Sequence, residues 1–163
     1  MVQIKKTIFL TLASGFGSGY LPWAPGSWGA AAAAVVGWWL VDLPISWYLV
    51  ITLILLLIGF VVTPVADKHF SIKSGHRHDN DRIVIDEWVG MLITLLPFYF
   101  FEKSLLYLGI AFLMFRIFDT LKFGLTKLAD QWHHPGGVML DDLMAGMHSG
   151  VFFFVALWIM EKM

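Results

Sequence analysis

The 163-residue sequence contains no cysteine, and only 14% of its residues are charged. The absence of cysteine excludes disulfides, a thiolate nucleophile and metal sites built on sulfur. The formal net charge of −1 offers no excess of basic residues for nucleic acid, so we expect no nucleic-acid partner. Ordinary soluble domains carry about 25% charged residues. The scarcity of charge therefore argues against a soluble domain.

Apolar residues take the place of the missing charge. They make up 58% of the chain, the mean hydropathy is +0.74, and there are eight Trp and fourteen Phe. Aromatic side chains gather where a bilayer meets water. The length suits one domain, so we predict a single membrane domain over residues 1–163.

Uncharged stretches predict the helices. Residues 43–66 have the roughly 20-residue length that crosses a bilayer, and 143–160 are just long enough. Residues 88–101 and 104–115 are shorter and predict a helical hairpin that enters and returns, and 28–41 predict another short helix. No stretch alternates as a β-strand does. The predicted fold is all-α: a compact multi-helix membrane bundle with short membrane-embedded helices.

Two polar segments, 67–87 and 116–142, carry most of the Lys and Arg outside the N-terminus, so the positive-inside rule places them in the cytoplasm. The acidic residues of these segments then lie on that same side: Asp79, Asp81, Asp86, Glu87, Asp119, Asp141 and Asp142. We therefore predict a multi-pass protein with an acidic site on the cytoplasmic face.

Asp86 and Glu87 stand directly before an apolar run. An Asp at mid-membrane costs roughly 2.5–3.5 kcal/mol, and each Leu, Ile, Phe or Val returns only about 0.3–0.6 kcal/mol. The eight such residues between Val89 and Phe101 offset about one buried charge. Both acids should therefore stand at the membrane boundary, facing protein or a cation. The alternative is that they only complement the positive end of a helix dipole.

The stretch "DEWVG" is repeated in kind by "DDLMAG" near the C-terminus. Asp86 precedes Gly90 by one helical turn, and Asp142 precedes Gly146 in the same way. Residues four apart share a helix face, and small residues let membrane helices approach closely. Acids from different helices should therefore converge.

Between these stretches lies "FRIFDTLK", in which Arg116, Asp119 and Lys122 are three residues apart and share one side of a helix. Carboxylates from three helices, with no sulfur and two basic groups nearby, fit Mg²⁺, which is held by a few carboxylates and substrate phosphate. The alternative is a network of surface salt bridges.

The N-terminal stretch "GFGSGYLPWAPGSWG" predicts a glycine-rich turn that leads into a helix. Backbone N–H groups in such a turn can hold phosphate, and the candidates are Gly17, Ser18, Gly26 and Ser27. No Walker lysine follows, so this is not a P-loop. Tight packing of small residues is the alternative explanation.

Four stretches of the sequence resemble, in order and spacing, those of the phosphatidylglycerophosphatase A family. They span residues 15 to 146 and are "GFGSGYLPWAPGSWG", "IVIDEWVGM", "FRIFDTLK" and "VMLDDLMAG". The resemblance implies a Mg²⁺-dependent enzyme of the bacterial inner membrane that converts phosphatidylglycerophosphate to phosphatidylglycerol and phosphate. The chain departs from the family where Lys-Pro-x-Pro usually follows the "FD" motif, because Phe123 and Gly124 follow Lys122 here.

The resemblance and the chemistry together assign roles. The candidate Mg²⁺ ligands are Asp79, Asp86, Glu87, Asp119, Asp141 and Asp142. Asp86, Glu87, Asp119, Asp142 and Lys122 are the predicted catalytic residues, and Lys122 and Arg116 would hold the phosphate. The attacking group is either water or an Asp. Because the substrate's acyl chains stay in the bilayer, its phosphate must react at the membrane surface, where the acids stand.

Two alternatives remain open from the sequence. A small transporter could bind a permeating cation with these acids, although they cluster at one surface and the short helices indicate no crossing pathway. A CDP-alcohol phosphotransferase is also a Mg²⁺ enzyme of phospholipid synthesis, but the repeated Asp and Gly that mark it along one helix are not found.

Overall fold

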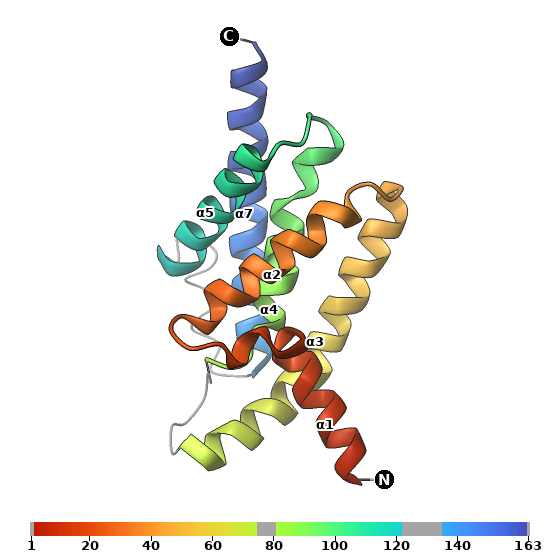
Figure 1. Cartoon of the computed structure of the whole chain (residues 1–163), viewed down its shortest axis with the longest axis vertical. Coiled ribbons are helices and arrows are strands. Elements are labelled where there is room, and N and C mark those ends of the chain that lie inside the picture. Colours follow the sequence, from red (N-terminus) through yellow and green to blue (C-terminus); the bar gives the residue numbers. More distant parts are fainter. Residues whose placement is uncertain (1, 75–80, 122–134, 163) are drawn as a thin grey trace.

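A computed structural model describes the backbone of residues 2–74, 81–121 and 135–162 (Figure 1). The α-helices are α1 (Val2–Ala13), α2 (Pro25–Leu40), α3 (Ile45–Ser74), α4 (Ile85–Thr94), α5 (Leu105–Leu121) and α7 (Pro135–Glu161), with 3₁₀ helices η1 (Gly15–Tyr20) and η2 (Leu96–Tyr99). These ranges contain no β-strand. The predicted all-α class is confirmed.

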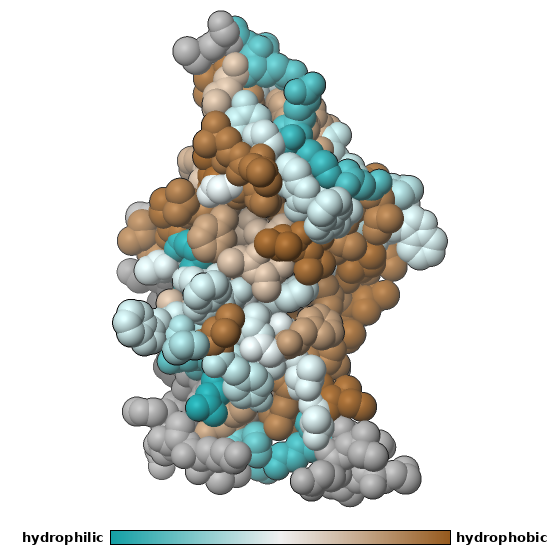
Figure 2. Space-filling view, viewed as in Figure 1, coloured by the Kyte–Doolittle hydropathy of each residue, from teal (hydrophilic) through white to brown (hydrophobic). Residues whose placement is uncertain are grey.

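Two helices are long and apolar enough to cross a membrane: Ile45–Phe70 of α3 and Gly137–Glu161 of α7. Only 28% of the most apolar part of each is buried inside the protein, whereas the core helix of a soluble protein would be mostly buried. Figure 2 shows apolar residues along the side of the molecule that α3 forms and polar residues toward both ends. These features and the composition together support a membrane protein.

Helices α3, α5 and α7 are longer than the sequence predicted, whereas the predicted helix 88–101 is divided into α4 and η2. α3 contains Pro64 and continues past residue 66 to Ser74. α5 and α7 extend into the polar segment 116–142 from its two ends. Polar residues do not end a helix, because the helical hydrogen bonds are made by the backbone. An interior proline is tolerated in membrane helices, where neighbouring groups satisfy the freed carbonyl. Hydropathy therefore marked the apolar part of each helix but not its ends.

Helix α4 occupies the centre of the molecule, with α2, α3 and α7 packed around it (Figure 1). Trp88 and Leu92 face the alanine-rich side of α2 in one hydrophobic cluster. Ile85 and Val89 belong to a second cluster that includes α3 and Met139 of α7. α4 is followed by η2 and a turn, and α5 runs back, as the predicted hairpin requires. The short helix is thus buried in protein.

Helices α4 and α7 touch through backbone atoms at two glycines. A methyl group on Gly146 would overlap the carbonyl oxygen of Gly90 and lie 2.8 Å from its Cα. A methyl group on Gly90 would lie 2.6 Å from the carbonyl oxygen of Asp142. Farther along the same pair of helices, the hydroxyl groups of Thr94 and Ser149 are 2.6 Å apart. The close approach predicted from the small residues is present.

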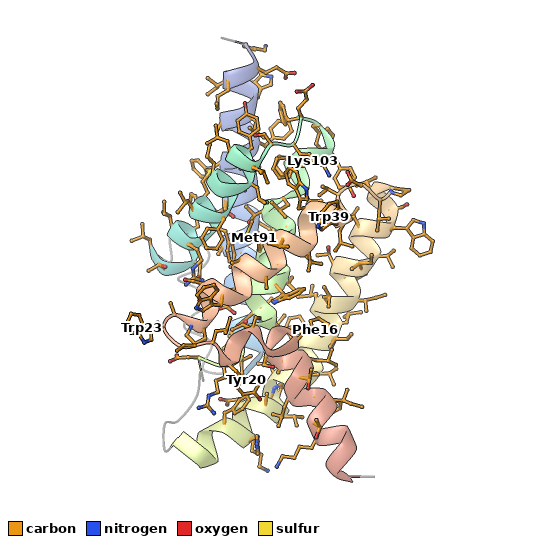
Figure 3. The ribbon with its side chains drawn as sticks, viewed as in Figure 1. Phe16, Tyr20, Trp23, Trp39, Met91 and Lys103 are labelled. Atoms are coloured by element: carbon orange, nitrogen blue, oxygen red, sulfur yellow. The ribbon has the colours of Figure 1, made fainter. Side chains whose placement is uncertain are left out.

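The turn between η2 and α5 is tied to the end of α2. Lys103 Nζ lies 2.6 Å from Asp42 Oδ1, donates to the Trp38 carbonyl at 3.1 Å, and sits 4.7 Å from the centre of the Trp38 ring. Figure 3 shows Lys103 near Trp39, on the other side of Met91 from Tyr20. Asp42, after α2, and Lys103, after η2, therefore join the two turns.

Candidate active site

Asp86 and Glu87 lie in the first turn of α4. The residue that precedes the helix is Val84, which makes no side-chain cap, and the Glu87 backbone N–H donates to Asp86 Oδ1 at 3.1 Å. The positive end of the helix dipole therefore stabilises both acids. However, Asp86 is only 4% exposed, whereas an acid that merely completes a helix end can stay in water at no cost. A capping role does not explain this burial.

Asp142 of α7 meets the two acids of α4. Asp86, Glu87 and Asp142 each place one carboxylate oxygen within 4.8 Å of the others, and Asp142 is 6% exposed. Each α-helix carries its acid one turn before its half of the Gly90–Gly146 contact, so the glycines set the distance between the acids. Asp141 is also buried beside them, at 7% exposure.

Helix α5 adds the third side of the site. Its Arg116 forms an ion pair with Asp119, one turn farther on. The Asp119 carboxylate also lies near enough to Asp142 for their charges to interact. The structure thus gathers acids of α4 and α7, and the Asp119 carboxylate of α5 is near enough for its charge to act on Glu87, in line with the convergence expected from the sequence.

The acids are poorly solvated and close to one another. Burial raises the pKa of Glu87 well above its ordinary value, and the nearby carboxylates of Asp86, Asp142 and Asp119 raise it further. Glu87 Oε2 and Asp142 Oδ2 are buried and have no hydrogen-bond partner among the described residues. Buried carboxylate oxygens of this kind are stabilised by a proton or a cation. An all-oxygen donor set fits a hard cation such as Mg²⁺.

The N-terminal turn reaches this site at Gly26. A methyl group on Gly26 would overlap Glu87 Oε1 and lie 3.5 Å from a guanidinium nitrogen of Arg116. A side chain at this position would displace the Glu87 carboxylate from its place beside the arginine. Gly26 is therefore the predicted phosphate-site residue that lies beside the acids.

The other members of that predicted set lie differently. The N–H groups of Gly17 and Ser27 donate to the carbonyls of Ser14 and Ala24, so both are engaged within the turn. Ser18 Oγ accepts from the Trp88 indole N–H at 3.4 Å, which joins the turn to α4. Asp79 and Lys122, also predicted for the site, lie outside the described residues.

Tight packing was one explanation for the glycines of the N-terminal turn, but the sequence did not indicate which of them pack. A methyl group on Gly15 would lie 2.9 Å from Trp88 Cδ1, and one on Gly19 would overlap the Arg82 carbonyl. Gly17 has open space around it instead. The "GFGSG" pattern signals a tight turn, but a single sequence does not tell which glycines face another segment.

Comparison with known proteins gives three relatives of similar length. A protein of Bacteroides thetaiotaomicron, provisionally named a phosphatidylinositol-3-phosphatase, is 36% identical over 163 residues, covering 96% of this chain and 99% of the relative. Phosphatidylglycerophosphatase A of Escherichia coli strain K12 is 34% identical over 146 residues (88% of this chain, 81% of the relative). Phosphatidylglycerophosphatase A of Haemophilus influenzae is 31% identical over 152 residues (91% of this chain, 89% of the relative).

No solved structure matches the chain. The family model described as Phosphatidylglycerophosphatase A matches residues 11–157, which include every acid of the described cluster. The chain therefore belongs to the phosphatidylglycerophosphatase A family.

Proposed function

We propose that the protein hydrolyses the terminal phosphate monoester of phosphatidylglycerophosphate to phosphatidylglycerol and inorganic phosphate, with Mg²⁺, at the cytoplasmic face of the bacterial inner membrane. The observation that carries the proposal is the gathering of Asp86, Glu87 and Asp142 at the α4–α7 contact, beside Arg116. Family membership favours this reaction over both alternatives that the sequence left open, because two relatives are named for it.

Asp86, Glu87 and Asp142 are the residues that would hold Mg²⁺, with Asp119 and Asp141 at the edge of the same cluster. This assignment is supported by Glu87 Oε2 and Asp142 Oδ2, which are buried and have no hydrogen-bond partner among the described residues. A bound Mg²⁺ would supply positive charge against the oxygens of the transferring phosphoryl group.

Arg116 and Gly26 would receive the phosphate. A guanidinium has five N–H donors, so the pairing of Arg116 with Asp119 leaves donors for phosphate oxygens. Gly26 adds no side chain of its own to the space between that guanidinium and the Glu87 carboxylate. Lys122, predicted from the same "FRIFDTLK" stretch, would add a second cation. These groups orient the phosphate while the acyl chains stay in the bilayer.

In the simplest form of the reaction a water oxygen bonds to phosphorus, and the bond from phosphorus to the glycerol oxygen breaks. A carboxylate of the cluster accepts the proton that the water loses, and the glycerol oxygen gains one. Burial raises the pKa of Glu87, so its carboxylate is a stronger base than that of an ordinary Glu. An Asp that attacks phosphorus directly would instead form a phosphoenzyme, which acid quenching during turnover would trap.

The name of the relative from Bacteroides suggests a second lipid substrate to test beside phosphatidylglycerophosphate. Its name refers to phosphatidylinositol 3-phosphate, another lipid whose headgroup carries a phosphate monoester. Both lipids could present that phosphate to a site at the membrane surface. We expect faster hydrolysis of phosphatidylglycerophosphate, because two relatives carry that substrate in their names.

The test is phosphate release by the purified protein in detergent, with each lipid, in Mg²⁺ and after chelation. Asp142→Asn should lower the rate roughly a hundred- to a thousandfold, the usual cost of removing one group that stabilises transition-state charge. Glu161→Gln is the matched control, since Glu161 lies at the exposed end of the same helix. Undiminished release after chelation, or a near wild-type rate for Asp142→Asn, would contradict the proposal.

A further inference from the structure

Residues 20–24, from the last residue of η1 to the start of α2, form a turn that presents large apolar side chains to the outside. Trp23 is 92% exposed, and Tyr20 and Leu21 are about half exposed. In Figure 3 the Trp23 side chain points away from the rest of the molecule. In water, a Trp held in this way would forgo the free energy of burying its large ring.

The backbone forces this exposure. Trp23 (φ 59°) and Ala24 (φ 55°) are consecutive left-handed residues, and neither is a glycine. Such residues carry backbone strain, so the conformation persists only where the surroundings impose it. The Trp28 indole N–H donates to the Pro22 carbonyl at 3.1 Å, and Ser27 N–H donates to the Ala24 carbonyl at 2.9 Å. The turn is therefore a braced element, and strain of this kind typically accompanies function.

The chemistry of the turn and its surroundings fits a lipid interface. The rings of Trp and Tyr have an apolar body and a polar edge, and they concentrate at the level of the headgroups. The exposed Arg82 places its guanidinium 6.0 Å from the centre of the Tyr20 ring. A long cationic side chain at this level can reach headgroup phosphates while its stem covers apolar surface. Aromatic rings and a cation together match the boundary between acyl chains and headgroups.

The turn is also close to the acids. Trp23 precedes Gly26 by three residues, and Gly26 lies against Glu87. Three residues span at most about 10 Å, so the turn cannot lie far from the acidic cluster. An anchor here would set the depth of the acids relative to the lipid headgroups.

We propose that residues 20–24 form an interfacial anchor, in which Trp23 is immersed at the headgroup–acyl boundary and holds the acidic cluster at the level of the substrate's phosphate. The anchor itself depends only on the membrane location. Its consequence for catalysis rests on the proposed function.

The direct test compares the Trp fluorescence of the wild type and Trp23→Phe in phosphatidylcholine vesicles. The emission that the substitution removes belongs to Trp23, one of eight Trp. This emission should be quenched by phosphatidylcholine brominated near the headgroup end of its acyl chains, and not by iodide in the water. Quenching by iodide alone would overturn the proposal. Protection from both quenchers would also overturn it, since protein would then cover the ring.

The second measurement is kinetic. Trp23→Ala should raise the KM for long-chain lipid substrate roughly tenfold with kcat unchanged, as expected when part of an aromatic ring's transfer free energy is lost. Trp23→Phe should restore most of the affinity. Trp39→Ala is the matched control, because Trp39 is 69% exposed at the other end of α2, and it should leave KM unchanged. Equal KM values for wild type and Trp23→Ala would refute the catalytic consequence, and the quenching result would still decide the anchor.

Discussion

Gly146→Ala tests whether the backbone contact between α4 and α7 holds the acids together. A methyl group on Gly146 would lie 2.8 Å from Gly90 Cα and 2.9 Å from the Gly90 carbonyl carbon. Both are backbone atoms, so no side chain can rotate out of the way. Carbon atoms pack best at roughly 3.5–4.0 Å, so the two helices must move apart by about 1 Å.

This movement would reach the acids directly. Asp142 lies one turn before Gly146, and Asp86 lies one turn before Gly90, so both carboxylates move with the glycines. A misplacement of about 1 Å in an active site can cost about a hundredfold in rate. We therefore expect phosphate release to fall about a hundredfold. Stability should change less, because an overpacking cost of about 1–3 kcal/mol is partly offset by the roughly 0.5–1 kcal/mol that Ala gains over Gly in a helix.

Gly109→Ala is the control for the change in backbone freedom. Gly109 lies within α5, and a methyl group there would meet nothing within 4 Å. This variant should keep the wild-type rate and gain about 0.5–1 kcal/mol in stability. Phosphate release and thermal unfolding in detergent measure both quantities. A Gly146→Ala variant as active as Gly109→Ala would show that the acids do not depend on the close approach of the helices.

Two further predictions concern pH and topology. Since burial and neighbouring acids raise the pKa of Glu87, the folded state binds its proton more tightly than the unfolded state. The chelated protein should therefore lose stability as the pH rises from the ordinary pKa of Glu toward the raised pKa of Glu87. Thermal unfolding measured across this pH range tests the prediction, and Glu87→Gln should make the stability depend less on pH. A stability that rises over that range would contradict the prediction. Because the chain has no cysteine, Ser74→Cys should escape an impermeant thiol reagent on intact cells while Glu102→Cys reacts. The reverse pattern would place the acids on the outer face.

The sequence contained enough information to predict the acidic cluster but not its setting. The four-residue spacing of Asp86 with Gly90, and of Asp142 with Gly146, is local and follows from helix geometry, so the contact of their helices was predictable. The burial of α4 on nearly all sides was not predictable, because the periodicity of one segment does not reveal how many helices surround it.

Long-range contacts account for the features that were missed. Trp88 meets Ser18 across 70 positions of sequence, and it is Trp88 that leaves no room for a side chain on Gly15. The left-handed conformation of Trp23 and Ala24 likewise carries no signal in residue type, since neither residue favours it. Such positions are set by what packs around them.

The acidic cluster opposes the stability of the fold that contains it. The carboxylates of Asp86, Glu87 and Asp142 lie close together, Arg116 is paired with Asp119, and Glu87 Oε2 and Asp142 Oδ2 are buried without a partner among the described residues. Side chains alone would relieve this repulsion by moving apart, but the glycine contact fixes the helices at the backbone. A cation that binds the folded state alone would then stabilise it by a free energy that grows with the logarithm of its concentration over its dissociation constant. Acids that served only as helix caps would show no such linkage, because the dipole of α4 already balances them. The burial of like charges at a rigid contact is therefore the feature that most strongly separates a metal-dependent site from a structural one.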